Sequence, residues 1–278
     1  MRYLLIALAF ATPQDEKAVA DAAKATLAKG SFTLQIAPAA DLKDALPADR
    51  AAIAGVQIVA EHLKDDTFHT TDGTTEFFGR GVVVLMKTKD GWRAAGDVVK
   101  ELIEDITAGS GKDDMARGNV SKTKAAYKRL VAIAQLAARS LPPKQHLSRL
   151  ETDFKGLKKG AIDTIDGKRC QVYEGDLKEL AAQLLLQGPY DQMVKDGTLA
   201  ITEMSGRGRV WVTADGLVRR IKLEAAGKYV VASKETTTKK TVPVTVTVTT
   251  DVLKAGETKL DVPQEVDDKI KALTPADK

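Results

Sequence analysis

Cysteine and aromatic residues are scarce in this chain of 278 residues. Its single cysteine, Cys170, cannot form an internal disulfide, so an apolar core must stabilise the fold. Aromatic residues make up 5% of the sequence, and no basic stripe alternates with them. The 42 Lys and Arg residues are interspersed with 38 Asp and Glu residues, which leaves a formal net charge of +4. We therefore expect no nucleic-acid partner.

Sequence motifs for catalysis and metal binding are missing as well. None of the histidines, His62, His69 and His146, forms a pair at the spacing of a metal site. No Gly-x-Ser-x-Gly nucleophile motif occurs, and Cys170 lies in an alternating apolar and polar segment that favours a small core residue of a strand. We accordingly expect no catalytic residue, no metal and no cofactor, and we do not expect an enzyme.

The only pronounced apolar run is short and begins the chain. Met1-Arg2 precedes the apolar run Tyr3 to Ala11, which ends in the small-x-small pair Ala9-Phe10-Ala11. This run is about half of the ~20 residues that a spanning helix needs. We expect a signal peptide at residues 1–11 and a soluble mature chain in the periplasm or outside the cell. The alternative is a short buried or interfacial helix in a cytosolic protein.

The remaining sequence predicts a globular domain with many strands, since 44% of its residues are hydrophobic and 29% are charged. Period-two alternation and turn dipeptides such as Asp215-Gly216 predict strands that follow one another in an antiparallel sheet. The expected strands cover residues 31–36, 56–60, 67–71, 75–78, 82–87, 170–173, 209–213, 217–224 and 241–250.

Helical periodicity interrupts this β pattern. Apolar residues recur every three or four positions in segments 14–29, 97–106, 121–140 and 177–185, which predicts four helices. The last of these follows Asp176-Leu177-Lys178-Glu179, which resembles a capping box with Asp176 as the N-cap.

Two segments of the chain are similar to each other. Thr75-Glu76-Phe77-Phe78-Gly79-Arg80-Gly81 matches Thr202-Glu203-Met204-Ser205-Gly206-Arg207-Gly208 at five of seven positions. Both a duplicated unit and two similar hairpins of one meander explain this similarity. We expect the Gly-Arg-Gly segments to be bends of a sheet and not phosphate loops, because no helix N-terminus follows them.

The last third of the chain resembles a known family. Residues 208–221, Gly-Arg-Val-Trp-Val-Thr-Ala-Asp-Gly-Leu-Val-Arg-Arg-Ile, are followed by a Val- and Thr-rich strand and by Val262-Pro263. This pattern is similar to the sheet hairpin of the LolA-like periplasmic lipoprotein carriers and of the mycobacterial lipid carriers of the LppX and LprG type. The helix and strand from Gln14 to Ile36 are also similar.

The resemblance implies an α+β fold. We expect a curved antiparallel sheet, an incomplete β-barrel, with helices packed on its concave face. Residues 12–278 would form one half-barrel domain with a helical insertion around residues 97–157.

The resemblance also implies an apolar cavity between sheet and helices, with a lipid or an acylated protein as the partner and transient contact with a membrane surface. The apolar residues expected to line the cavity are Phe32, Leu34 and Ile36 on one strand, Val244, Val246 and Val248 on another, and Leu177, Leu180 and Leu184 on a helix. The alternative is a structural or interaction protein of the cell envelope, with a filled core and no ligand.

The export hypothesis leads to a direct test. N-terminal sequencing of the protein made in a secreting host is expected to begin near Thr12, because signal cleavage follows the small-x-small pair. An intact Met1 in the soluble fraction would contradict it.

Overall fold

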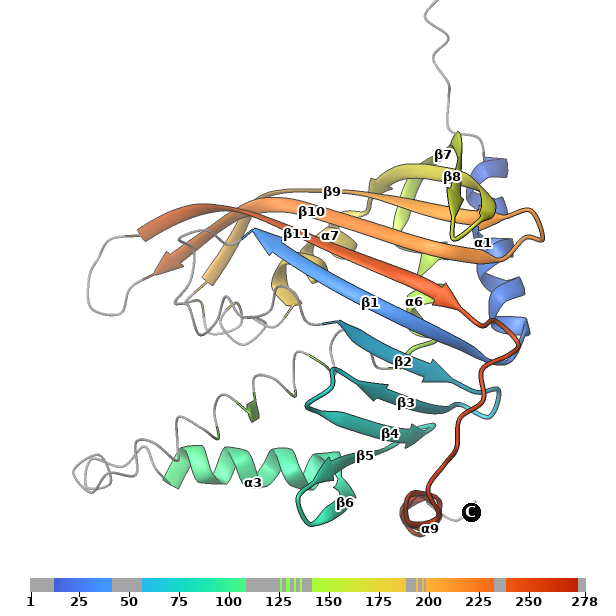
Figure 1. Cartoon of the computed structure of the whole chain (residues 1–278). Coiled ribbons are helices and arrows are strands. Elements are labelled where there is room, and N and C mark those ends of the chain that lie inside the picture. Colours follow the sequence, from blue (N-terminus) through green and yellow to red (C-terminus); the bar gives the residue numbers. More distant parts are fainter. Residues whose placement is uncertain are drawn as a thin grey trace, which may run out of the picture.

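One antiparallel sheet of eleven strands dominates the described part of the computed structural model (Figure 1). The structure describes residues 13–41, 57–108, 142–188, 199–232 and 239–274, together with single residues at 126, 129, 130, 133, 136, 194 and 197. The predicted signal peptide and most of the helix predicted over residues 121–140 lie outside these ranges. The strand order is β6-β5-β4-β3-β2-β1-β11-β10-β9-β8-β7.

The sheet consists of two meanders. The first contains β1 (Phe32–Asp41), β2 (Ile58–His62), β3 (Thr67–Thr71), β4 (Glu76–Arg80), β5 (Val83–Thr88) and β6 (Gly91–Ala94). The second contains β7 (Phe154–Ile165), β8 (Lys168–Leu177), β9 (Leu199–Thr213), β10 (Val218–Ala232) and β11 (Lys239–Leu253). They join where β1 pairs with β11, and the sheet ends at two different strands, β6 and β7. The sheet is therefore open, which confirms the predicted α+β fold with an incomplete barrel.

Helices cover the sheet. Those that the structure describes in full are α1 (Pro13–Ala28), α3 (Ala95–Ala108), α6 (Gln145–Ser148), α7 (Glu179–Gln187) and α9 (Gln264–Leu273), and a 3₁₀ turn, η1 (Arg149–Glu151), follows α6. Figure 1 shows α1 across one end of the long strands, and α6 and α7 beneath their concave side. None of the helices in the described part of the chain is long and apolar enough to cross a membrane.

The C-terminal helix α9 packs on the opposite face of the sheet, which the sequence pattern did not predict. Successive strand residues point to opposite faces. Phe77 of β4 accordingly joins the main core, whereas Phe78 packs against Val266 and Ile270 of α9. An ion pair between Arg80 Nη1 and Asp267 Oδ1, at 3.2 Å, also links β4 to α9.

Carboxylates of α1 protect the free edge of the sheet. Glu16 Oε1 accepts a hydrogen bond from the Gly156 backbone N–H at 2.8 Å, and Asp15 Oδ2 accepts one from Lys159 N–H at 3.2 Å. Both donors belong to β7, the edge strand. Pairing these backbone groups removes sites to which another chain could add as a strand.

Cys170 is fully buried in β8, as expected for a strand residue of the core. It packs with Ile165, Val172 and Trp211 in a cluster separate from the main core. Burial raises the pKa of the Cys170 thiol because the thiolate would lose its hydration.

The predicted turn and the two Gly-Arg-Gly segments occur in the sheet. Gly216 adopts φ +77° between β9 and β10, which confirms the hairpin at Asp215-Gly216. Gly79 lies in β4, and β5 follows the first segment. Gly208 lies within β9, and the same strand continues after the second segment. An added Cβ at Gly79 would lie 2.4 Å from Phe68 Cζ, and one at Gly208 would lie 2.6 Å from Phe154 Cε1. These glycines therefore make room for aromatic rings.

Substitution of Gly208 tests this close packing. We expect Gly208→Ala to lower the free energy of unfolding by about 1–3 kcal/mol, because the new methyl group overlaps the buried ring of Phe154. Gly160→Ala in β7 is the matched control, since its Cβ would lie no closer than 3.5 Å to any neighbour. Urea denaturation measures both variants, and equal stabilities would contradict the ring-over-glycine packing.

Candidate functional site

The concave face of β10 and β11 forms the floor of the candidate site. The ladder pairs Ile221 with Thr250, Leu223 with Val248 and Ala225 with Val246. Cross-strand partners share a face of the sheet, so these side chains form one continuous surface. The Val and Thr alternation of β11 explains which residues contribute, because each second residue of a strand points the same way.

Helix α7 lies close to this floor on one side. An added Cβ at Gly206 of β9 would lie 3.0 Å from Ala182 Cβ, and one at Gly227 of β10 would lie 3.0 Å from Leu186 Cδ1. The hydroxyl of Tyr229 donates a hydrogen bond to the carbonyl of Leu186. Small residues below the helix and a buried tyrosine at its end thus hold α7 on the sheet.

The predicted capping box of α7 is wrong. Asp176 and Leu177 are the last residues of β8, where they pair with Lys155 and Phe154 of β7. The N-cap of α7 is Lys178, and it makes no side-chain hydrogen bond to the helix. The strand therefore continues where the local pattern suggested a helix start, and Leu177 does not share a helical face with Leu180.

A short segment before β7 forms the opposite wall of the site. Leu147 of α6 and Leu150 of η1 are buried in the main core and anchor this segment. Between them, Arg149 forms an ion pair with Asp153, with 3.1 Å between Nε and Oδ2. The side chain of Arg149 is 44% exposed and that of Asp153 is 17% exposed. The segment thus brings a charged pair to the edge of an apolar surface.

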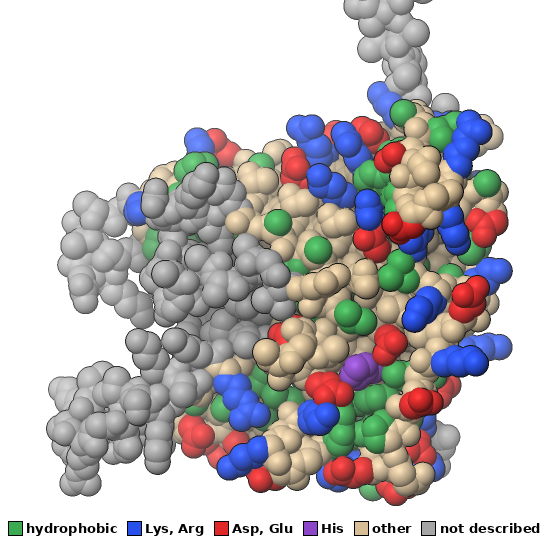
Figure 2. All heavy atoms as spheres, in the orientation of Figure 1, with side chains coloured by type: hydrophobic (Ala, Val, Ile, Leu, Met, Phe, Trp, Pro, Cys, Tyr) green, Lys and Arg blue, Asp and Glu red, His purple; other side chains and the backbone are tan. Residues whose placement is uncertain are grey.

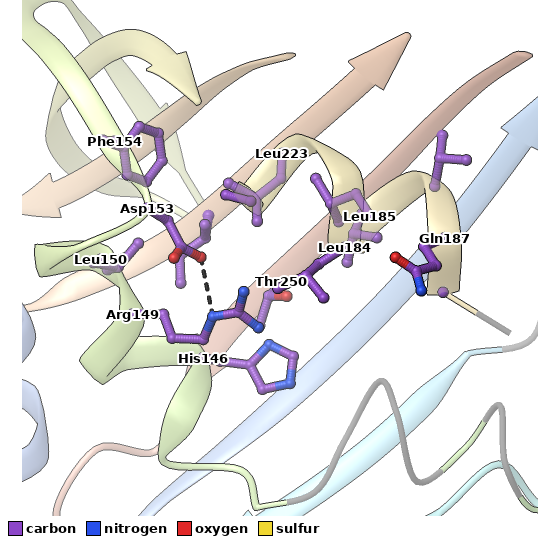
Figure 3. A pocket seen from close by; sticks show the side chains of 15 residues that line it. His146, Arg149, Leu150, Asp153, Phe154, Leu184, Leu185, Gln187, Leu223 and Thr250 are labelled. Atoms are coloured by element: carbon purple, nitrogen blue, oxygen red, sulfur yellow. Dashed lines mark ion pairs between the residues drawn. The ribbon is translucent and has the colours of Figure 1, made fainter. Parts of the chain in front are cut away.

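Floor and walls enclose a cavity of about 390 Å³ (Figure 3). Its apolar lining comes from β10, β11, α7, η1 and the start of β7, and its polar lining includes His146, Arg149, Asp153 and Gln187. Figure 3 shows the guanidinium group of Arg149 directed toward the interior. Pockets of roughly 300–1,000 Å³ with mainly apolar walls and a few polar groups are typical of small-molecule sites.

Apolar side chains of the cavity retain exposed surface. Leu184 is 43% exposed, and Leu185, Leu223 and Val248 are half-buried. In contrast, Tyr229, further along β10, has no exposed surface. The described structure therefore leaves apolar surface uncovered at this part of the concave face.

The nine residues predicted to line a cavity lie in three environments. The cavity lining includes Leu184, Val246 and Val248. Deep in the main core lie Phe32, Leu34, Ile36, Leu177 and Val244. Leu180 is 66% exposed on α7. The register places β1 beside β11, with Ile36 opposite Thr250, so the first two groups share one face of the sheet.

Sequence reasoning did not find the polar part of the cavity. His146, Arg149 and Asp153 belong to a stretch that matched no recognised pattern. Their only local signal is the spacing of four residues between Arg149 and Asp153, which is common on helix surfaces. Their position beside β10 and β11 depends on tertiary packing.

The other histidines lie outside this cavity. His69 of β3 lies between two carboxylates, with Nδ1 3.2 Å from Glu61 Oε2 and Nε2 3.1 Å from Glu76 Oε1. His62 of β2 is buried beside Phe32, and burial lowers the pKa of its imidazole. Within the described residues, no group of three or more His, Cys, Asp or Glu side chains is arranged to hold a metal ion.

Comparison with known proteins gives matches only among solved structures. No family model and no curated protein matches the chain. The lipoprotein LppX of Mycobacterium tuberculosis is 11% identical with a TM-score of 0.43, and the match covers 90% of this chain and 99% of LppX. LprF from Mycobacterium bovis is 12% identical with a TM-score of 0.44, and the match covers 92% of this chain and 99% of LprF.

A putative outer membrane lipoprotein-sorting protein domain from Vibrio parahaemolyticus is 10% identical, with a TM-score of 0.25 and coverage of 86% of this chain and 92% of that domain. At these identities and TM-scores a likeness carries no information on function, which has to be inferred from the cavity itself. The chain thus has only a weak structural likeness to these lipoproteins and to this lipoprotein-sorting domain.

Substitution of two leucines distinguishes the filled core from the wall of the cavity. Leu34→Ala should lower the free energy of unfolding by about 2–5 kcal/mol, because Leu34 has no exposed surface. Leu184→Ala should cost less than about 1.5 kcal/mol, because its side chain is already 43% exposed. Chemical denaturation measures both, and equal losses would show that Leu184 belongs to a filled core.

Proposed function

We propose that this protein binds a lipid, or the acyl chain of a lipid-modified partner, in the cavity between α7 and strands β10 and β11. The observation that carries the proposal is the partly exposed apolar lining of Leu184, Leu185, Leu223 and Val248 in a cavity of about 390 Å³. Burial of an alkyl chain there is favourable by about 0.8 kcal/mol for each CH₂ group removed from water. No catalytic step is part of this proposal.

Export is the second part of the proposal. The predicted signal peptide places the mature protein in the periplasm or outside the cell, where a soluble carrier moves lipids between membranes. Leu180 supports transient contact with a membrane surface, because it is exposed one helical turn from Leu184. Figure 2 shows acidic and basic side chains interspersed on one face of the molecule, without a large patch of one sign.

The alternative is an envelope protein with a packed core and no ligand. Phe32, Leu34 and Ile36 favour it, since all three are fully buried and need no ligand to cover them. This filled region is the part of the concave face nearest β1. The two functions therefore differ only in what occupies the region beside α7.

Extraction and probe uptake distinguish them. Organic extraction of the purified protein, followed by mass spectrometry, should yield a co-purified lipid. The uncharged probe N-phenyl-1-naphthylamine should gain fluorescence on binding the delipidated protein, because its rings leave water. Leu184→Glu should weaken this uptake by about tenfold or more, since a carboxylate in the lining must lose hydration when the cavity fills.

Leu180→Glu is the matched control. It lies on the same helix but outside the described cavity lining, so probe uptake should stay unchanged. Far-UV circular dichroism checks that both variants fold. Absence of lipid in the extract together with absence of probe uptake by the unaltered protein would exclude the binding function and favour the filled-core alternative.

A further inference from the structure

We propose that the cavity prefers a single-chain amphiphile with an anionic head, whose carboxylate or phosphate oxygens bind the guanidinium group of Arg149. This inference rests on the proposed lipid-binding function and specifies the class of ligand. It follows from the position of the charged groups of the cavity lining, which lie on one wall beside an apolar floor.

The charged and ionisable groups of the lining are concentrated on one wall. His146, Arg149 and Asp153 all come from the segment before β7, whereas β10 and β11 contribute the apolar residues Ile221, Leu223, Val246 and Val248 and the uncharged Thr250. An alkyl chain on the strands would therefore place its head group beside that segment. Gln187 and the backbone at Gly188 add only uncharged polar groups, from the end of α7 on the other wall.

The orientation of Arg149 suits an oxyanion. Asp153 Oδ2 is nearest to Nε, at 3.1 Å, and the described residues accept no hydrogen bond from the two terminal amino groups. Figure 3 shows these terminal groups directed into the cavity, while the dashed ion pair to Asp153 ends at Nε. A planar guanidinium group with two free N–H edges binds carboxylate or phosphate through paired hydrogen bonds.

The charge of Asp153 does not prevent this binding. Its carboxylate is mostly covered, and its contact with Nε holds the guanidinium plane in place. Four hydrogens on the terminal amino groups remain for a head group. Asp153 therefore positions Arg149, and we expect the head group to contact Arg149 itself.

The volume favours one chain. A cavity of about 390 Å³ lies at the low end of the range for small-molecule sites, roughly 300–1,000 Å³. A single acyl chain with a small head is thus a better match than a lipid with several long chains.

Competition against N-phenyl-1-naphthylamine tests the head-group preference. In the unaltered protein, palmitate and palmitoyl lysophosphatidate should displace the probe more strongly than methyl palmitate, which has the same chain without charge. Arg149→Gln should weaken binding of the two anionic ligands by about tenfold, the value of one charge-assisted hydrogen bond. Binding of methyl palmitate should not change, and this result also shows that the variant keeps its cavity.

Arg209→Gln is the matched control. Arg209 forms an ion pair of the same kind, with 3.2 Å between Nε and Glu174 Oε1, and its side chain is 49% exposed. It belongs to β9 but not to the cavity lining, so ligand affinities should stay unchanged. If Arg149→Gln fails to fold, Arg149→Lys keeps the charge without the paired geometry and should show a smaller loss for the anionic ligands.

The outcomes separate the two proposals. Equal displacement by palmitate and methyl palmitate, with no effect of Arg149→Gln, would overturn the anionic preference and leave lipid binding intact. No displacement by any of the three ligands, with no uptake of the probe, would overturn lipid binding itself. Inorganic phosphate alone should not displace palmitate at millimolar concentration, and full displacement would overturn the single-chain ligand class. The relative affinities of palmitate and palmitoyl lysophosphatidate identify the head.

Discussion

The pairing of β1 with β11 is the interaction on which the rest of the structure depends. Nine Cα pairs, from Thr33 with Leu253 to Asp41 with Thr245, join the two meanders into one sheet. The partners are far apart in sequence, so chain entropy opposes this contact and buried side chains such as Leu34 must offset it. A slip of one residue would turn the apolar side chains to the other face, and the Val and Thr alternation of β11 therefore determines the register.

The cavity results from uneven packing of α7 on that sheet. Below one side of the helix lie Gly206 and Gly227, where a Cβ would come within 3.0 Å of the helix side chains. On the other side, Leu184 and Leu185 face the side chains of β10 and β11 across open space. Helix α7 approaches the sheet closely at the glycines, which have no side chain. It stays further from the sheet where β10 and β11 carry large side chains, and this difference leaves a gap. The glycines that permit tight packing thus also help to define the cavity.

Local patterns predicted those elements whose residues alternate or repeat regularly. The strand predicted over residues 67–71 is β3, and the first helix differs by one residue at each end from Pro13–Ala28. The edge strand β7 was missed because most of its residues are exposed and show no alternation. The N-terminus of α7 was misplaced because Asp176 resembles a cap but pairs in a ladder. Of the nine predicted lining residues, Leu184, Val246 and Val248 line the cavity. Its charged residues could not be predicted, because only tertiary contacts bring them beside β10 and β11.

The same face of the sheet contains both a core and a cavity, and this division bears on function. Beside β1, Ile36 and its neighbours are fully covered by the chain itself. Beside α7, Leu223 and Val248 retain exposed surface although they lie on the same face of the same sheet. Exposed apolar surface in a concave site is common at ligand-binding sites. Contact of this surface with water is unfavourable, and a bound ligand removes it from water. Since Arg149 and Asp153 border that surface on one side only, the site combines one charged side with an apolar floor, as an amphiphile requires.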